Sequence, residues 1–172
     1  MKQTDFLPLQ ISVLVVSDSR TEESDTSGKI LVKLLSEAGH RLAEKCFVPD
    51  DIYQIRAVLS RWIVDPTVDI ILSTGGTGLT SRDRTPEAVM PLFDKVIDGF
   101  GELFRRKSFD EISTSTIQSR VTAGVANGTY IFCLPGSSGA CRTGWEKILA
   151  NQLDISSRPC NFAELIPRLT EK

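Results

Sequence analysis

The sequence predicts an α/β domain with a mostly parallel sheet, and three observations indicate this class. Short β-prone runs alternate with longer segments whose apolar residues recur at helical spacing. Polar or glycine-bearing loops follow the β-prone runs, as expected where parallel strands end. The chain has 172 residues, of which 41% are hydrophobic and 24% are charged, which suits one globular domain. We therefore expect a single domain over residues 1–172, with irregular termini.

The first half of the chain contains the clearest strand and helix signals. Runs rich in valine, isoleucine and leucine predict strands, and apolar residues three and four positions apart predict amphipathic helices between them. In order along the chain, these segments are Ile11–Val16, Ile30–Ala38, Leu42–Val48, Ile52–Ile63 and Val68–Ser73. We expect the first helix to begin at Asp25 or Thr26 and to end at Gly39.

The second half carries weaker signals apart from one strand. The run Thr129–Leu134 is β-prone, and the helical stripe after it is typical of core residues: Cys141, Trp145, Ile148 and Leu149. Helical segments are also expected at Val89–Leu92, at Gly99–Lys107 and from a Ser113–Thr116 cap to Arg120. We expect the tail after Leu153, which contains Pro159 and Pro167, to extend over the surface or to pack on another subunit.

A glycine-rich stretch directly follows the expected strand Val68–Ser73. Glycines allow positive φ and let backbone N–H groups approach a ligand that a Cβ would obstruct, which favours an anion. The residues of this loop are Thr74, Gly75, Gly76, Thr77 and Gly78. No Gly-Lys-Ser/Thr follows, so the loop is not a Walker loop, and its spacing is not that of the dinucleotide fingerprint.

Asp83 stands between this loop and the next helix. Thr85 suits the N-cap and Pro86 the first helical position, so Asp83 is expected just outside the positive end of that helix. A carboxylate there repels a bare phosphate, and it makes chemical sense mainly if a cation such as Mg²⁺ sits between the two. The alternative is that the glycines only make a tight turn and that Asp83 accepts local backbone N–H groups.

Four polar loops follow the four expected strands. Because the carboxyl ends of parallel strands meet at one edge of a sheet, these loops are expected to form one site for a phosphorylated small molecule. They are Ser17–Arg20, Pro49–Asp51, Thr74–Thr85 and Pro135–Gly139. Asp50 or Asp51 alternatively serves only as the N-cap of the helix that follows.

Several classes of function are disfavoured by composition. A net charge of −2 argues against a general nucleic-acid or polybasic membrane surface, and no apolar run approaches the length of a membrane span. We expect a cytoplasmic protein. The four cysteines show no metal-like spacing and are expected to be reduced and mostly buried, and His40 is the only histidine, which disfavours a histidine-dependent catalytic triad.

The motifs along the chain also carry a family resemblance. They include Thr74–Gly78, Arg82-Asp83 with Thr85–Ala88, Pro49-Asp50, Gly99–Glu102, Ser119-Arg120 and Leu134–Gly136. Together they cover nearly the whole chain, and in this order they resemble the molybdenum cofactor biosynthesis family. The stretches Ser17–Arg20, Asp25–Gly28 and Arg158–Phe162 are most similar to its MoaB branch.

The resemblance implies a three-layer α/β/α sandwich that binds molybdopterin. Active members transfer AMP from Mg-ATP to the terminal phosphate of molybdopterin and release pyrophosphate, whereas MoaB-branch proteins are less uniformly catalytic. The family's two functional carboxylates correspond to Asp50 and Asp83, and we expect these two residues to be catalytic and to orient Mg²⁺. A non-catalytic molybdopterin carrier and an oligomeric scaffold are the alternatives.

Further binding roles are expected on the same basis. Nucleotide phosphate is expected at Thr74, Gly75, Gly76, Thr77 and Gly78, and at Pro135, Gly136 and Ser137. Weaker candidates for the pterin phosphate are Ser17, Arg20, Ser119 and Arg120.

The resemblance also implies partners. We expect a homo-oligomer, either a trimer or a hexamer, and possible partners among other molybdenum cofactor biosynthesis proteins. Apolar residues in segments of weak core periodicity are expected between subunits, and the alternative is that the core of a single chain absorbs them. They are Phe100, Leu103, Phe104, Phe109 and Phe162.

Overall fold

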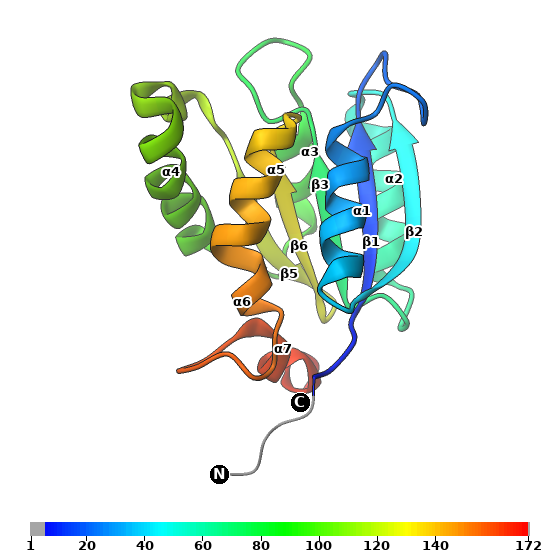
Figure 1. Ribbon diagram of the computed structural model, residues 1–172. Helices are drawn as coiled ribbons and strands as arrows, with labels where there is room; N and C mark the ends of the chain where they lie inside the picture. Colours follow the sequence, from blue (N-terminus) through cyan, green and yellow to red (C-terminus); the bar gives the residue numbers. More distant parts are fainter. Residues whose placement is uncertain (1–5, 172) are drawn as a thin grey trace.

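The computed structural model describes residues 6–171 and contains one six-stranded sheet in the order β2-β1-β3-β6-β5-β4 (Figure 1). The strands are β1 Gln10–Val16, β2 Arg41–Val48, β3 Ile70–Thr74, β4 Lys95–Val96, β5 Thr122–Ala126 and β6 Thr129–Leu134. The four strands predicted from the sequence are therefore confirmed, and they share one sheet. The irregular amino terminus predicted for residues 1–5 lies outside the described residues.

The helices occupy the segments between the strands and the carboxyl-terminal part of the chain. The α-helices are α1 Ser27–Glu37, α2 Ile52–Ile63, α3 Thr85–Val89, α4 Asp98–Ile112, α5 Ser138–Gly144, α6 Ala150–Gln152 and α7 Phe162–Leu165. Short 3₁₀ segments form η1 Met90–Leu92, η2 Ser113–Gln118 and η4 Ile166–Arg168, and a π-helical turn η3 Trp145–Leu149 joins α5 to α6. No helix among residues 6–171 combines the length and apolarity that a membrane span requires.

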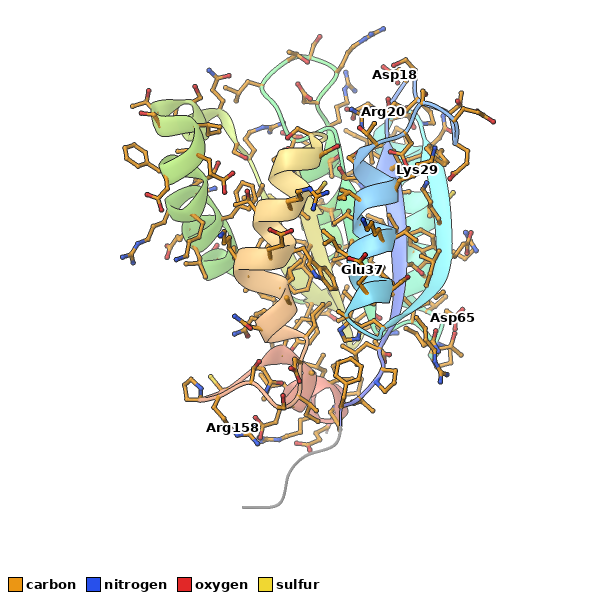
Figure 2. The ribbon with its side chains drawn as sticks, in the orientation of Figure 1. Asp18, Arg20, Lys29, Glu37, Asp65 and Arg158 are labelled. Carbon is orange, nitrogen blue, oxygen red and sulfur yellow. The ribbon has the colours of Figure 1, made fainter. Side chains whose placement is uncertain are left out.

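Strands β2, β1, β3 and β6 are parallel neighbours, so their carboxyl ends lie at one edge of the sheet. Figure 2 shows Asp18 and Arg20, which follow β1, at this edge, and Asp65 at the opposite edge. Only β5 runs against its neighbours, β6 and β4. It joins β6 through Asn127 and Gly128, both at positive φ, which is the hairpin turn that an Asn-Gly pair favours.

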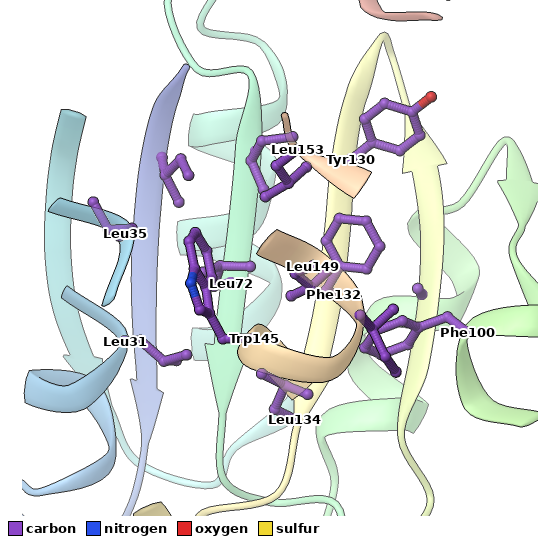
Figure 3. Packing of buried hydrophobic residues seen from close by; sticks show 14 of the residues in the cluster. Leu31, Leu35, Leu72, Phe100, Tyr130, Phe132, Leu134, Trp145, Leu149 and Leu153 are labelled. Carbon is purple, nitrogen blue, oxygen red and sulfur yellow. The ribbon is translucent and has the colours of Figure 1, made fainter. Parts of the chain in front are cut away.

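Helices cover both faces of the sheet, which confirms the three-layer α/β/α arrangement. Helices α1 and α5 lie in front of the sheet in Figure 1, and α2 and α3 lie behind it. The buried cluster on the front face, shown in Figure 3, includes Leu31, Leu72, Phe100, Phe132 and Trp145. The cluster on the back face includes Leu14, Leu59, Trp62, Ile71 and Ile131. The predicted stripe after β6 is core, as expected.

Two predicted helix details are wrong. Thr85 is the first residue of α3 rather than its N-cap, because its hydroxyl donates to the Gly75 carbonyl and its N–H to the Gly76 carbonyl. Arg84 takes the N-cap position without a side-chain cap bond. The Ser113–Thr116 segment does not cap a helix to Arg120, since it forms the 3₁₀ segment η2, which ends at Gln118.

The carboxyl-terminal tail lies on the surface of its own chain, which is one of the two predicted placements, and Phe162 docks it on the core. The ring of Phe162 lies 4.9 Å from that of Tyr130 and 5.7 Å from that of Phe132, both on β6. Burial of these apolar rings together stabilises the docked tail. Phe100 and Phe104 are likewise buried in this chain's own core, so of the five apolar residues expected between subunits only Leu103 and Phe109 are exposed.

The cysteines are free thiols, and three of the four are buried or half-buried. Burial raises the pKa of Cys133 to about 12 and that of Cys141 to about 11, so both stay protonated and are poor nucleophiles at neutral pH. His40 is buried at the turn before β2, where its Nδ1 accepts the N–H of Leu9.

Candidate functional site

A cavity of about 610 Å³ opens at the carboxyl edge of the parallel strands. The loops after β1, β2, β3 and β6 all contribute to its lining, as the sequence predicts. Predicted site residues in the lining are Ser17, Arg20, Asp50, Gly75, Gly76, Thr77, Gly78, Asp83, Ser119, Pro135, Gly136 and Ser137. Thr74 and Arg120 are absent from it.

The β1–α1 loop is shaped by the Ser17 hydroxyl. This oxygen accepts the N–H groups of Ser19 at 3.3 Å and Arg20 at 3.2 Å, which turns the chain sharply after β1. The Arg20 guanidinium then donates to the Ser27 hydroxyl at 2.7 Å. Arg20 therefore reaches the cavity wall as a fixed positive charge.

A buried ion pair between Asp25 and Lys45 holds the end of this loop against β2. The Asp25 carboxylate lies 2.8 Å from Lys45 Nζ and accepts the Gly28 N–H at 2.9 Å. A Cβ at Gly28 would collide with the Asp25 carboxylate, so only glycine permits this approach. The pair ties the start of α1 to β2.

The β2–α2 loop separates the roles of two adjacent carboxylates. Asp51 is the N-cap of α2, accepting the N–H groups of Tyr53 and Gln54. Asp50 does not cap the helix, and its Oδ1 accepts the Arg84 N–H at 2.9 Å. The Asp50 N–H in turn donates to Asp18 at 3.0 Å. The alternative of Asp50 as a mere helix cap is therefore wrong.

Glycines of the β3–α3 loop take the expected positive φ, 104° at Gly75 and 65° at Gly76. A Cβ on Gly75 would collide with the Val16 carbonyl, and one on Gly76 would lie 2.7 Å from an Asp50 oxygen. One amide of the predicted cradle is not available, because the Gly75 N–H donates to the Leu134 carbonyl at 3.0 Å. The N–H groups of Gly76 and Thr77 donate to no other residue within 6–171.

The Asp83 carboxylate is held by its own loop. Its Oδ2 accepts the Thr80 N–H at 2.8 Å and the Thr80 hydroxyl at 2.6 Å. Burial acts to raise the pKa of Asp83, but the bonds from Thr80 and the Gly78 N–H, with the charge of Arg120, outweigh it and lower that pKa. Asp83 is thus ionised at neutral pH. The alternative that Asp83 accepts local backbone N–H groups is correct for its Oδ2.

Asp50 has the opposite electrostatic character. Burial raises the pKa of its carboxyl, the Arg84 N–H bond opposes that rise, and the charges of Asp83 and Asp18 add to it. Two carboxylates facing one cavity with pKa values pushed in opposite directions are typical of functional sites. A cation between them would relieve their mutual repulsion.

The second wall is built from β6 and the residues after it. Ser137 caps α5 by accepting the Ala140 N–H at 3.2 Å, and Gly136 lies against Gly75, where a Cβ would come within 3.3 Å of the Gly75 Cα. Thr74 is fully buried, and its hydroxyl donates to the Pro135 carbonyl at 2.9 Å. Its predicted contact with phosphate is therefore corrected: Thr74 joins the two glycine loops instead.

Ser119 and Arg120 are adjacent in sequence but separate in the site. Ser119 lines the cavity, and its buried hydroxyl has no hydrogen-bond partner among the described residues. The Arg120 side chain lies outside the lining, where it donates to backbone carbonyls of the β3–α3 loop and pairs with Glu87. This placement favours support of the loop over contact with the pterin phosphate.

Sequence reasoning missed the wall that α4 and η2 provide. It consists of Phe104, Ser108, Ile112, Ser115 and Gln118. One signal was present, because Phe100, Phe104 and Ser108 recur every four residues on the buried face of α4. A serine in the place of a third apolar residue indicates that this face leaves the core and meets a polar cavity.

The donor chemistry of the cavity is compatible with a magnesium ion that phosphate groups help to hold. The described residues contain no cluster of three acidic, histidine or cysteine side chains that would hold a metal by themselves. Magnesium is commonly held by one or two carboxylates together with substrate phosphates. Asp50 and Asp83 supply that donor set beside the free N–H groups of Gly76 and Thr77.

Comparison with known proteins identifies the family. A family model described as "Probable molybdopterin binding domain" matches residues 12–154. The chain belongs to this family. It is also 55% identical over 159 residues to molybdenum cofactor biosynthesis protein B of Escherichia coli (strain K12), across 92% of this chain and 94% of that protein. The predicted family and branch are confirmed.

Solved structures of this molybdopterin-binding family share the fold. A crystal structure of a molybdenum cofactor biosynthesis protein B superposes with a TM-score of 0.83 at 42% identity, covering 86% of this chain and 92% of that one. The tungsten cofactor synthesizing protein MoaB of Pyrococcus furiosus superposes with a TM-score of 0.74 at 37% identity, covering 82% and 90%. The sheet and helices that carry the cavity loops therefore belong to a shared architecture.

Proposed function

We propose that the chain binds molybdopterin in this cavity and transfers AMP from ATP to its terminal phosphate. An oxygen of the pterin phosphate forms a bond to the α-phosphorus of ATP. The bond from that phosphorus to the bridging oxygen breaks, and pyrophosphate leaves with the electron pair. Because the attacking phosphate is already ionised at neutral pH, the reaction needs positioning and charge stabilisation rather than a general base.

One observation carries this proposal: two carboxylates with opposed pKa shifts face the same cavity as unpaired backbone N–H groups. Asp50 comes from the β2–α2 loop, and Asp83 comes from the β3–α3 loop, which also carries the free amides of Gly76 and Thr77. The pKa of Asp50 is raised and that of Asp83 is lowered. Backbone N–H groups bind phosphate oxygens without adding negative charge. This donor set suits a nucleotide better than an uncharged ligand.

Asp50 and Asp83 are the residues that would hold Mg²⁺. When bound, the ion would neutralise phosphate oxygens and lower the repulsion between the two anionic substrates. Arg20 would add a fixed positive charge at the same end of the cavity. Gly136 and Ser137 would close the phosphate end from the β6 side.

The α4 and η2 wall suits the ring of a bound molecule. Phe104 and Ile112 offer apolar surface, while Ser108, Ser115 and Gln118 offer hydroxyl and amide groups. A flat heteroaromatic ring with a polar edge, such as a pterin or an adenine, needs this mixture. The unpartnered Ser119 hydroxyl would gain a hydrogen bond from such an edge.

The proposal is tested by replacing each carboxylate with its amide. Asp50→Asn and Asp83→Asn should keep molybdopterin affinity and lower AMP transfer by about 10²-fold or more, the scale on which one electrostatic stabiliser is felt. The measurement is transfer of labelled AMP, with molybdopterin binding followed by calorimetry. Asp51→Asn is the matched control, since asparagine caps a helix as well as aspartate. Wild-type rates in both test variants would refute the assigned roles.

A binding protein without transfer activity is the second candidate. The Thr80 bonds to Asp83 favour it, because a carboxylate already satisfied by its own loop gains less from a cation. Folded wild-type protein that binds molybdopterin with no AMP transfer would establish this candidate.

We also propose a cytoplasmic, homo-oligomeric protein that exchanges its pterin with other cofactor biosynthesis proteins. The exposed Leu103 and Phe109 on α4 support the assembly. A trimer or a hexamer is expected from the family resemblance.

A further inference from the structure

The Arg120 side chain lies across the base of the β3–α3 loop. Its Nε donates to the Gly78 carbonyl at 2.7 Å, and a terminal nitrogen donates to the Asp83 carbonyl at 2.8 Å. These carbonyls stand at the two ends of residues 79–82. One guanidinium therefore closes the loop that presents Asp83 to the cavity.

The same guanidinium is anchored on both sides. It forms an ion pair with Glu87 on α3, and this hydrogen bonding lowers the pKa of the Glu87 carboxyl although burial opposes it. The backbone N–H of Arg120 donates to the Thr77 carbonyl at 3.2 Å. The Arg120 side chain is 29% exposed, so solvent screens these contacts only in part.

Few other contacts hold the loop. Leu79 is 68% exposed, and neither buried cluster contains a residue of 77–84. Apart from Arg120, the tip is tied to the rest of the chain by the Arg84 N–H bond to Asp50 and by an exposed pair between Arg82 and Asp18 at 3.6 Å. Exposed ion pairs of this kind contribute about 0 to 1 kcal/mol.

We propose that Arg120 is a positioning residue that fixes the β3–α3 loop so that the Asp83 carboxylate faces the cavity. It does this without touching molybdopterin or ATP. The catalytic part of this inference rests on the proposed AMP transfer, whereas the structural part does not.

The chemistry of the contact requires arginine. Its planar guanidinium donates from separate nitrogens to Gly78, Asp83 and Glu87 at once. Lysine carries the same charge on one nitrogen and lacks this fork. Arg120→Lys should therefore behave much like Arg120→Gln.

Kinetics separate positioning from substrate contact. In Arg120→Lys and Arg120→Gln, kcat for AMP transfer should fall by about 10- to 100-fold, because a small displacement of a catalytic group has that effect. The KM and the dissociation constant for molybdopterin should stay within about 2-fold of wild type. Arg20→Gln, which alters the cavity wall, should instead raise KM. Arg61→Gln, at an exposed pair with Glu44, is the control and should change neither constant.

Chemical rescue and loop protection give independent readouts. Guanidinium ion at a non-denaturing concentration should restore activity to Arg120→Ala, and ammonium ion should not. In ligand-free Arg120→Gln, the amides of residues 78–84 should exchange faster and trypsin should cut faster after Arg82 and Arg84. Amide exchange and trypsin cleavage need no turnover, so they judge the inference even if wild-type protein transfers no AMP.

Two results would overturn the inference. If Arg120→Gln bound molybdopterin more weakly while amide exchange and trypsin cleavage of the loop stayed unchanged, Arg120 would be a substrate contact. Unchanged kcat together with unchanged protection would show that the loop does not depend on Arg120.

Discussion

The Asp50 carboxylate accepts a hydrogen bond from the Arg84 N–H at 2.9 Å, and this bond joins the β2–α2 loop to the β3–α3 loop beside the cavity. The junction is possible because Asp51, one residue later, caps α2. It also places Asp50 near two other carboxylates, Asp18 and Asp83, whose charges oppose its ionisation. The site therefore stores electrostatic strain at the residue that is proposed to meet the cation.

This strain predicts a pH-dependent cost in stability. Burial and nearby charges raise the folded-state pKa of Asp50 above its ordinary value of 3.8. Ionisation of Asp50 therefore lowers the free energy of unfolding as the pH rises above 3.8, and this cost is absent below pH 3.8. Asp50→Asn keeps an acceptor for the Arg84 N–H and removes the charge. It should raise the free energy of unfolding at about pH 7 and leave it unchanged at about pH 3. Thermal unfolding at the two pH values measures the difference, with Asp51→Asn as the control. An equal gain in stability at both pH values would contradict the prediction.

The Asp25–Lys45 pair should dominate the stability of the β1–α1 region. Because Asp25 is buried and Lys45 is nearly so, Asp25→Ala leaves Lys45 paired only with the exposed Glu22 and removes the acceptor of the Gly28 N–H. It should cost about 3 to 5 kcal/mol in chemical denaturation. Glu37→Ala, which breaks an exposed pair with Lys33, should change stability by less than about 0.5 kcal/mol. Equal losses of stability in Asp25→Ala and Glu37→Ala would mean that burial does not determine how much an ion pair contributes.

The same pair predicts two pH limits. Burial acts to raise the pKa of Asp25, but bonds from Lys45 and backbone N–H groups lower it overall, so its contribution is present above the ordinary value of 3.8 and is lost as the pH falls through the folded pKa. Burial acts to lower the pKa of Lys45, but Asp25 and Glu22 raise it overall. Its contribution is therefore lost as the pH rises through a folded pKa above 10.5. In Asp25→Ala the acid-side loss should disappear.

Gly76 should be intolerant of a side chain. In Gly76→Ala the new Cβ would meet an Asp50 oxygen and the Thr85 hydroxyl, and the residue would be held at a φ of 65°. We expect a loss of more than about 1 kcal/mol in stability and of about 10²-fold in AMP transfer. Gly139→Ala is the control, because its Cβ meets nothing within 4 Å, and it should be neutral or stabilising by about 0.5 to 1 kcal/mol. Wild-type activity in Gly76→Ala would remove Asp50 from the proposed mechanism.

Assembly should depend on α4 and η2. Phe109 on α4 is 52% exposed, and Ile117 on η2 is 81% exposed. Light scattering should give the mass of a trimer or a hexamer, and replacing both residues with aspartate should lower it. Tyr53→Asp, at an equally exposed position on α2, should leave the mass unchanged. A monomer mass for wild-type protein at micromolar concentration would refute the proposed assembly.

The sequence by itself determined the order of elements and the edge at which the loops meet. Strand runs such as Ile11–Val16 and stop signals such as Gly39 act through local backbone preference, so they are visible without a structure. The parallel arrangement then follows from alternation, and it brings the four loops together. The positive φ at Gly75 and Gly76 was predictable for the same reason, because it is a local backbone conformation, whereas the contacts with Val16 and Asp50 that exclude a Cβ there are tertiary.

Only the tertiary structure decided which neighbouring polar group faces the cavity. Asp50 and Asp51 are chemically identical, yet Asp51 is held by the neighbouring Tyr53 and Gln54 N–H groups, whereas Asp50 meets the Arg84 N–H, 34 residues later. Thr74 is turned inward by Pro135, 61 residues later, and Arg120 is turned away by Gly78, 42 residues earlier. Strand β5 and the wall on α4 were missed for a related reason. Their burial is set by what packs against them, and the only local signal was the serine at position 108 in the apolar stripe of α4.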